Sequence, residues 1–280
     1  MVRDQHKTMG EFAGGIEGRN GRTKWLEREP YAYWKGNPYV ADARRDLLKC
    51  NVSEEHDWNA RLFVQDWILE SQQGYKHSGL ASQCAHRFKI YIEGHAWSVS
   101  EKYILACDSV TLLVKPYFYD FFSRSLVPLK HYWPIRGTDK CRSLKFAVHW
   151  GNTHHHEARE IGKAASDFLL EKVTMEHVYD YMFHLLKEYA NLLKFKPKVP
   201  DGATELCSEV VACPANGTER EFMTESLSKG PSPTGPCEMP PPYEEKVIGD
   251  MWRRNAMAMR RVERWENEYW ESIIDSRQQG

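Results

Sequence analysis

The chain has 280 residues, of which 41% are hydrophobic and 12% aromatic, so it is long enough for one large or two ordinary domains with a sizeable core. Its 38 basic and 39 acidic side chains nearly cancel, which argues against a nucleic-acid partner and against electrostatic binding to an acidic membrane. No apolar run is long enough for a signal peptide or a membrane span, so no targeting segment is expected in this chain.

The first 71 residues show no single pattern of secondary structure. Residues 1–23 are polar and rich in glycine, which predicts a flexible lead-in. A strand should end in the turn at residues 36–38, because Gly, Asn and Pro follow one another there. The apolar stretch 57–71 fits a helix and a strand equally well, and both interpretations stay open.

Arg44 and Arg45 lie in residues 41–49, a stretch that is typical of a short helix. Two neighbouring guanidinium groups can bind a phosphate in bidentate fashion. They suit the solvent-facing side of a helix equally well. A phosphate site is therefore only one of two interpretations here.

The most informative part of the chain lies between two expected strands. Residues 88–93 alternate apolar and polar side chains, which is the period of a half-buried strand, and Gly94 breaks that strand. Ser98 is expected to open a helix, with Glu101 in the capping-box position three residues on. The fully apolar residues 110–114 then predict a strand in a sheet that is covered on both faces.

A strand, a glycine turn and a helix start together predict an anion site, because free backbone N–H groups and the positive end of the helix dipole converge there. The side chains of Trp97, Ser98, Ser100 and Lys102 lie in or beside this turn, which begins at Gly94. Our hypothesis is that a nucleotide diphosphate binds here. The alternative is that Ser98 only caps its helix and Lys102 only faces water. Spacing alone favours this alternative, since the turn lacks the G-x-G-x-x-G fingerprint.

Beyond this stretch, helices and strands alternate, which argues for an α/β fold with a parallel sheet. The expected elements are a short aromatic helix over 117–122, a strand over 131–135, and helices over 141–150, 154–171 and 175–193. The last of these is the clearest helix of the chain, because its apolar residues recur at helical spacing over its whole length.

The character of the sequence changes after residue 195. Residues 197–243 hold most of the prolines and several cysteines, and we expect an extended segment that wraps on the surface or is held by disulfides. Residues 244–276 return to a helical period with one apolar face. That face can pack back on its own domain or meet a partner. Packing back is the expected arrangement, since amphipathic helices mostly serve their own core.

The cysteines contain no C-x-x-C pair, so a zinc ribbon or a thioredoxin-like motif is not expected. They fit either isolated buried thiols or scattered disulfides. Two N-glycosylation sequons, at Asn51 and Asn216, together with the cysteines of the proline-rich segment, favour an oxidising lumen. The seven cysteines are Cys50, Cys84, Cys107, Cys141, Cys207, Cys213 and Cys237.

Other candidates for chemistry are weaker. The run His154-His155-His156-Glu157 lacks the i, i+4 spacing at which helix side chains share a metal, so no metal site is predicted. Three aspartates offer a carboxylate base for an acceptor hydroxyl, but no sequence feature pairs any of them with a partner. They are Asp66, Asp108 and Asp120, and the catalytic residue stays unknown.

Several motifs carry a family resemblance when they are taken as a set. They are Trp34-Lys35-Gly36, Arg44-Arg45-Asp46-Leu47, Cys84, the run from Lys89 to Ser98 with Lys102, Phe121-Phe122 and His131-Tyr132-Trp133-Pro134-Ile135. This set resembles the Rumi-like protein O-glucosyltransferases, which share the lipopolysaccharide-modifying, capsule-associated-protein type of glycosyltransferase domain. The resemblance covers about residues 24–275. The exact residues of its motifs are similar to those of the plant branch of the family.

The resemblance implies a B-type glycosyltransferase with two Rossmann-like domains and a UDP-sugar bound between them. No metal or other cofactor is implied, because positive side chains and the helix dipole take the charge of the leaving UDP. Gly94, Ser98, Ser100 and Lys102 match the nucleotide-binding motif of the family. The implied acceptor is a hydroxyl of a protein or glycan, the donor sugar is glucose or xylose, and the compartment is the lumen of the endoplasmic reticulum or Golgi.

The resemblance also divides the chain into five parts. They are the lead-in at 1–23, a remnant of the N-terminal Rossmann-like domain at 24–82, the C-terminal nucleotide-sugar-binding domain at 83–195, the Pro/Cys-rich segment at 196–243 and the amphipathic helix at 244–276.

Two departures from the family pattern bear on activity. Animal relatives carry an arginine where this chain has Ser100, so that phosphate contact is weaker here or is supplied by Arg44, Arg45 or Lys102. The family's catalytic aspartate lies upstream, in a half-domain that this chain is expected to lack, so we expect no sugar transfer by the chain alone. The rival interpretations are a catalytically dead remnant that binds a nucleotide sugar or carbohydrate, and an interaction protein that works through its Trp-rich terminal helix.

Overall fold

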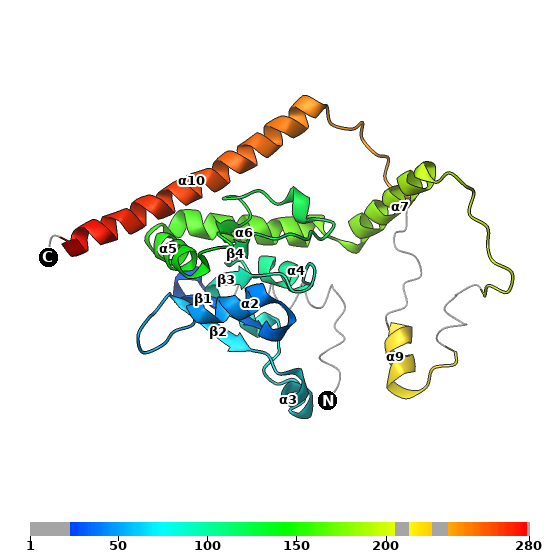
Figure 1. The fold of residues 1–280 in the computed structure, drawn as a ribbon. Coiled ribbons are helices and arrows are strands. Elements are labelled where there is room, and N and C mark those ends of the chain that lie inside the picture. The colour runs from blue at the N-terminus through cyan, green and yellow to red at the C-terminus, as the bar shows by residue number, and fades with distance from the viewer. Residues whose placement is uncertain (1–22, 205–212, 226–234, 279–280) are drawn as a thin grey trace. The chain divides into compact units, whose positions relative to one another are not determined.

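The computed structural model describes residues 23–204, 213–225 and 235–278. The described chain forms two compact units. One unit comprises the described residues between 173 and 242, and the other comprises the described residues up to 172 together with 243–278. Figure 1 shows the helices and strands of both units.

The larger unit is built on one sheet of five parallel strands in the order β2-β1-β3-β4-β5. The strands are β1 (Glu29–Gly36), β2 (Ala60–Val64), β3 (His86–Tyr91), β4 (Val110–Val114) and β5 (Trp133–Ile135). The order reverses once, because β2 lies on one side of β1 while β3, β4 and β5 follow on the other. The prediction of an α/β fold with a Rossmann-like parallel sheet is confirmed.

This sheet takes strands from both sides of the domain boundary expected near residue 82. β1 and β2 come from the stretch 24–82, and β1 pairs directly with β3 through Ala32–Phe88 and Tyr33–Lys89. The two stretches therefore form one sheet with a shared core, which differs from the two Rossmann-like units expected from the sequence.

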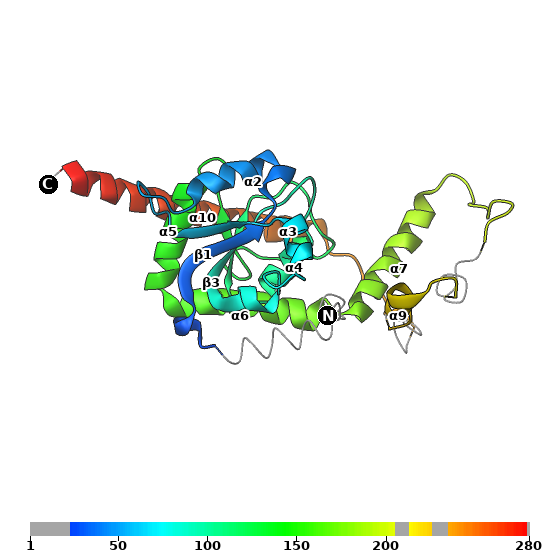
Figure 2. The same cartoon turned by 90° about the horizontal axis from the view of Figure 1, so that it is seen from below.

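The two central strands are buried on both faces. All five residues of β4 are buried, as its apolar run predicted. The half-buried pattern expected for residues 88–93 is wrong, because Lys89, Tyr91 and Glu93 are as buried as their apolar neighbours. The reason is that β3 lies between β1 and β4 and has core partners on both faces. Ile90 shares a core cluster with Leu144 of α5, while Tyr91 packs with Ile104 of α4. Figure 2 shows both helices beside the sheet.

Three long helices of the larger unit lie where the sequence places them. They are α5 (Lys140–Thr153), α6 (His155–Lys172) and α10 (Glu245–Gln278). The shorter elements are α2 (Asp42–Leu47), α3 (Trp67–Gln72), α4 (Ser100–Leu105) and the 3-10 helices η1 (Trp25–Glu27), η2 (Pro38–Val40), η3 (Leu48–Cys50), η4 (Ala81–Ala85) and η5 (Ser123–Ser125). The ambiguous stretch 57–71 contains both structures that it allowed, since β2 is followed by α3. None of the described helices is long and apolar enough to cross a membrane.

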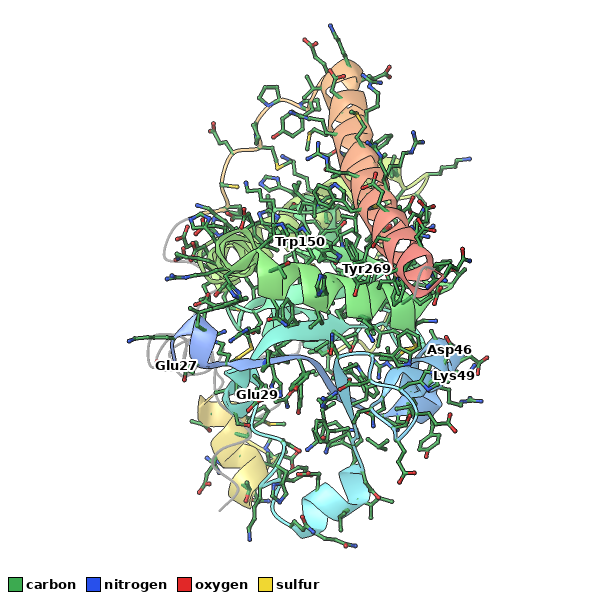
Figure 3. All side chains as sticks on the ribbon, turned by 90° about the vertical axis from the view of Figure 1, so that its left-hand side faces the viewer. Glu27, Glu29, Asp46, Lys49, Trp150 and Tyr269 are labelled. Carbon is green, nitrogen blue, oxygen red and sulfur yellow. A yellow bond between two sulfur atoms is a disulfide. The ribbon has the colours of Figure 1, made fainter. Side chains whose placement is uncertain are left out.

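α10 packs on α5 through a seam of aromatic rings. The Trp265 ring lies 6.2 Å from that of Trp150 and 6.3 Å from that of Trp133. The Tyr269 ring lies 5.3 Å from that of Phe146. Figure 3 shows Trp150 and Tyr269 where the two helices meet. The terminal helix therefore packs back on its own unit, as expected.

Residues 117–122 form a loop, so the short aromatic helix expected there is wrong. Glu93, which follows β3, provides the physical reason. Its Oε2 accepts hydrogen bonds from the backbone N–H groups of Tyr117 (2.9 Å) and Phe118 (3.0 Å). These bonds tie the start of the loop to the end of β3, and the chain turns only later, in η5.

The smaller unit contains α7 (Met175–Leu192) and α9 (Gly217–Glu225) among its described residues. α7 confirms the helix predicted over 175–193, and none of its residues is buried. α9 lies inside the segment that was expected to be extended, which corrects that prediction for 217–225. The reason is a run of good helix formers after Gly217.

Hydrogen bonds hold a described part of the Pro/Cys-rich segment to α7. Asp180 Oδ1 accepts the N–H of Cys237 (3.2 Å), and His184 Nε2 lies 2.7 Å from the Cys237 carbonyl oxygen. Of the two alternatives expected for this segment, disulfides are excluded at Cys213 and Cys237, because both are free thiols. Cys207 lies outside the described residues.

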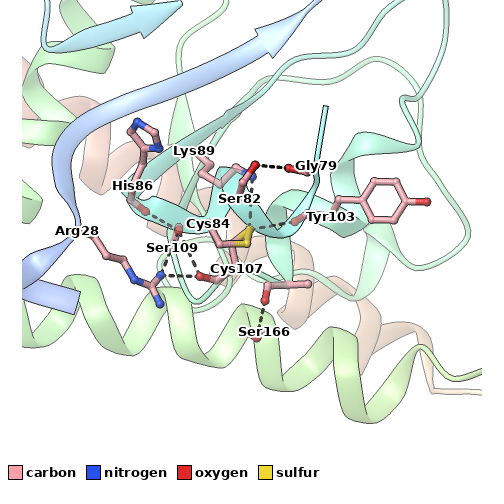
Figure 4. The surroundings of a disulfide bond; sticks show 11 residues. Arg28, Gly79, Ser82, Cys84, His86, Lys89, Tyr103, Cys107, Ser109 and Ser166 are labelled. Carbon is pink, nitrogen blue, oxygen red and sulfur yellow. Dashed lines mark hydrogen bonds between the residues drawn. A yellow bond between two sulfur atoms is a disulfide. The ribbon is translucent and has the colours of Figure 1, made fainter. Parts of the chain in front are cut away.

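The larger unit contains two disulfides, Cys50–Cys141 and Cys84–Cys107. They decide between the two interpretations of these cysteines in favour of scattered disulfides. Figure 4 shows the second bond with Lys89 beside it. Lys89 Nζ lies 3.4 Å from Cys107 Sγ, and burial lowers the pKa of Lys89 to about 7.

We expect loss of the Cys50–Cys141 disulfide to destabilise the fold more than loss of the Cys84–Cys107 disulfide. The sequence separations are 91 and 23 residues. Chain entropy for loops of these sizes amounts to about 4.6 and about 3.4 kcal/mol. Urea unfolding of the paired variants C50A/C141A and C84A/C107A tests this order. The reverse order would show that packing around the sulfur atoms, and not chain entropy, sets the loss.

Candidate functional site

The carboxyl ends of β1 and β3 meet where the strand order of the sheet reverses. Open α/β sheets bind ligands outside the carboxyl ends of their strands at such a switch point. The loop after β1 leads through η2 into α2, and the turn after β3 leads into α4. This edge of the sheet is the candidate site, and residues 94–100 are called the β3–α4 turn below.

The Arg44 side chain connects the two loops at this edge. Its guanidinium donates hydrogen bonds to three backbone carbonyls: Nε to Glu93 (3.0 Å), Nη1 to Asn37 (3.3 Å) and Nη2 to Ile92 (3.1 Å). Burial lowers the pKa of Arg44. Most of the N–H donors of Arg44 are thereby used, so this side chain holds the frame of the site.

Arg45 lies apart from this network. Its side chain is 58% exposed, and its Nη2 pairs with Asp42 Oδ1 at 3.2 Å on the same helix. The structure therefore brings Arg44 to the β3–α4 turn but not Arg45, and the two guanidinium groups do not form a joint clamp.

The β3–α4 turn differs from the predicted capping box. α4 begins at Ser100, its N-cap residue is Val99, and no side chain caps it. The N–H of Ser98 donates to the Tyr91 hydroxyl (3.1 Å), and Ser98 Oγ lies 2.9 Å from Ser100 Oγ. The capping box is wrong because the carboxyl group of Glu101 is buried and bonded elsewhere. Because α4 has only six residues, its dipole is weak. Any anion bound at the β3–α4 turn would therefore be held mainly by the hydroxyl and amide groups of the turn.

Glu101 places a buried carboxyl group beside the turn. The residue is 2% exposed, and its Oε2 accepts a hydrogen bond from Ser123 Oγ at 3.0 Å. Burial raises the pKa of Glu101 to about 7, and the charge of Asp120 adds to this effect while the Ser123 bond opposes it. The sequence did not reveal this role, because Glu101 stands where a capping glutamate is usual.

Glu93 connects the same edge to the loop after β4, which carries three exposed aromatic rings. Tyr117 is 81% exposed, Phe118 49% and Tyr119 51%. Trp97, on the β3–α4 turn, is 43% exposed. Exposed rings of this kind can stack on sugars and bases. Sequence reasoning missed Glu93 because it read as the solvent-facing residue of a half-buried strand. Its position directly before the glycine turn was the available signal.

Five of the seven candidate residues lie on or directly after the β3–α4 turn: Gly94, Trp97, Ser98, Ser100 and Lys102. A Cβ added at Gly94 would lie 3.6 Å from Arg44 Nη2, which is an ordinary contact distance, so packing does not by itself require glycine here. Lys102 is half-buried, and its Nζ lies 5.9 Å from the centre of the Tyr103 ring.

None of the three candidate aspartates is a free carboxylate at the carboxyl edge of the sheet: two bond to nearby backbone N–H groups, and one lies at the opposite edge. Asp66 caps α3, and Asp120 Oδ1 accepts the N–H of Phe121 (2.7 Å). Asp108 lies just before β4, at the opposite edge of the sheet, with φ at 50°. Within the described residues, no group of three His, Cys, Asp or Glu side chains could hold a metal ion.

A comparison with protein families assigns most of the chain. The model of a family described as "Glycosyl transferase family 90" matches residues 6–266. This match includes the whole sheet and the β3–α4 turn.

Curated relatives are similar over about two thirds of the chain. Protein O-glucosyltransferase 2 of Danio rerio is 26% identical over 70% of this chain and 40% of its own length. Protein O-glucosyltransferase 3 of Homo sapiens is 24% identical over 67% and 37%. O-glucosyltransferase rumi of Drosophila melanogaster is 20% identical over 66% and 46%. The chain thus spans less than half the length of these relatives.

The buried Glu101 should make stability depend on pH. Its raised pKa means that the folded state favours the neutral carboxyl group, so stability should fall as the pH rises from 4.5 to about 7. In E101Q this loss should vanish, and the variant should be the more stable form at pH 8, by on the order of 3 kcal/mol. The difference in free energy of urea unfolding between the two proteins, followed from pH 4.5 to 8, measures the effect.

E160Q provides the control, because Glu160 is exposed on α6. It should leave the pH dependence of the parent protein unchanged. Parallel stability curves for E101Q and the parent protein would contradict a buried, neutral Glu101.

Proposed function

Because this chain belongs to glycosyl transferase family 90, we propose that it binds a UDP-sugar at the edge between β1 and β3 and serves in sugar transfer to a hydroxyl group of a protein or glycan. The observation that carries the proposal is the position of the β3–α4 turn at the switch point of a parallel sheet. The named relatives are O-glucosyltransferases, so glucose is the first donor sugar to test and xylose the second.

The β3–α4 turn offers groups that suit a diphosphate. The hydroxyls of Ser98 and Ser100 lie 2.9 Å apart and share one hydrogen bond, so one of the two keeps a proton that it can donate to a phosphate oxygen. Lys102 adds a positive charge that binds phosphate as a point charge. During transfer, negative charge develops on the departing UDP, and donors aimed at it stabilise the transition state more than the ground state. In this proposal the turn holds the diphosphate without a metal ion.

The exposed aromatic rings suit the remainder of the ligand. Trp97 lies on the β3–α4 turn, and the backbone N–H groups of Tyr117 and Phe118 are bonded to Glu93, directly before that turn. Aromatic faces bind the apolar faces of sugar rings and of bases. Because Glu93 already orders the backbone of the loop, less conformational entropy is lost when a ligand binds.

Sugar transfer also requires a base that takes the proton of the acceptor hydroxyl. Glu101 is not proposed for this role, since its carboxyl group is buried and accepts a hydrogen bond from Ser123. We therefore propose that the described residues bind the sugar donor and stabilise the leaving group.

The proposed compartment is the lumen of the secretory pathway, in the endoplasmic reticulum or Golgi. The support is chemical: disulfides form and persist in oxidising compartments and are rare in the cytosol. Two of them, Cys50–Cys141 and Cys84–Cys107, join parts of the larger unit.

Titration of UDP into the purified protein in a calorimeter tests the donor site. UDP should bind, and S98A and K102A should each weaken binding about tenfold, because each removes one hydrogen bond or one charge from the diphosphate. No binding of UDP to the parent protein would exclude the proposal. Unchanged affinity in both variants would exclude this turn as the donor site.

K163A is the control matched in charge to K102A. Lys163 Nζ pairs with Asp167 at 2.8 Å on α6, and its charge acts on Asp108, which lies beyond the far end of α4. Affinity for UDP in this variant should equal that of the parent protein. A tenfold loss in K163A as well would show that the net charge of the protein, and not a local contact, governs binding.

A further inference from the structure

We propose that Asn216 carries an N-linked glycan and that Asn51, which stands in an equally complete sequon, does not. The two sequons are Asn51-Val52-Ser53 and Asn216-Gly217-Thr218. The inference rests on the lumenal location proposed above. The two asparagines differ in how each side-chain amide is bonded and exposed in the fold.

The Asn51 side chain is part of the fold. β2 is the edge strand of the sheet, so the backbone N–H groups on its outer side have no strand partner. Asn51 Oδ1 accepts the N–H of Leu62 at 2.9 Å and takes the place of that partner. Cys50, the preceding residue, is fully buried and disulfide-bonded to Cys141. The amide group of Asn51 is therefore half-buried and fixed in orientation.

The third residue of this sequon is engaged as well. Ser53 Oγ accepts the N–H of His56 at 3.1 Å and lies 3.4 Å from the His56 carbonyl oxygen. The amide oxygen of Asn51 and the hydroxyl of Ser53 are both bonded inside the fold. A glycan is bulky and hydrated. The fold would accommodate it poorly on Asn51, because that side chain takes the place of a strand partner for β2.

Asn216 stands in different surroundings. Asn216, Gly217 and Thr218 are all exposed at the start of α9 in the smaller unit. Gly217 has φ at 59°, a left-handed conformation that glycine adopts readily, so the chain changes direction directly after Asn216. Asn216 Nδ2 makes one long hydrogen bond, of 3.4 Å, to the carbonyl oxygen of Pro214. A glycan on this nitrogen meets solvent and displaces no core contact.

The modification transfers an oligosaccharide from a lipid-linked pyrophosphate donor to Asn216 Nδ2. The bond between the anomeric carbon and the pyrophosphate oxygen breaks, and the pyrophosphate leaves with the electron pair. A bond forms between the same carbon and Nδ2, which gives up one proton. The amide becomes N-substituted, and no oxidant or reductant is needed.

Digestion with peptide-N-glycosidase tests the proposal. The whole chain, preceded by a cleavable leader, is produced in a eukaryotic secretory pathway and compared on a gel before and after digestion. One shift in mobility is expected for the parent chain. The shift should be lost in N216Q and in T218A, two variants that remove the same sequon through different residues.

S53A is the matched control, because it removes the other sequon and leaves the bond from Asn51 to Leu62 in place. The shift should persist unchanged in this variant. Loss of the shift in S53A, two successive shifts in the parent chain, or no shift at all would each overturn the proposal.

A gel run without reductant separates this result from the proposed location. If the two disulfides form in the secreted chain and no shift is seen, the glycan is excluded while the oxidising location stands. If neither disulfide forms there, the proposed location fails by itself.

Discussion

The three hydrogen bonds donated by Arg44 are the interaction on which the carboxyl edge of the sheet depends. A carbonyl left without a partner in a buried place costs about 1–3 kcal/mol, and one planar guanidinium satisfies carbonyls from the ends of both β1 and β3. Glu93 extends this network, since its carbonyl accepts from Arg44 and its carboxylate accepts from Tyr117 and Phe118. The loops after β1, β3 and β4 thus form one hydrogen-bonded unit around the switch point.

This network determines what kind of binding site the edge can be. The β3–α4 turn is held before any ligand arrives, because the Ser98 N–H donates to the Tyr91 hydroxyl and the Ser98 and Ser100 hydroxyls are bonded to each other. Such preordered donors need little reorganisation when charge develops on a ligand. Elsewhere in the unit, the aromatic seam between α5 and α10 fixes the C-terminal helix to the sheet through Trp133 and Trp150. Residues 262–269 of α10 therefore belong to the core of the larger unit.

The elements that the sequence predicted well are those whose signal is contained in their own residues. The apolar run of β4 and the helical periods of α5, α6, α7 and α10 are of this kind. The failures depend on contacts between distant residues: Glu101 reads as a capping residue, but its partner is Ser123, 22 positions away. Arg44 was named as a phosphate ligand, and its carbonyl partners Ile92 and Glu93 lie 48 and 49 positions away. Local spacing carries no information about such partners, which only the packed sheet brings together.

The two disulfides are nested, because Cys84–Cys107 lies inside the stretch of chain that Cys50–Cys141 encloses. The covalent connectivity of the larger unit is therefore a closed ring with a smaller ring inside it. The exposed residues 52–57 are the natural place for a protease to cut this ring. A single cut there opens the backbone but releases no fragment, since the strands on either side of the cut remain joined through sulfur. A nicked molecule keeps the sheet and its carboxyl edge assembled for as long as its surroundings stay oxidising.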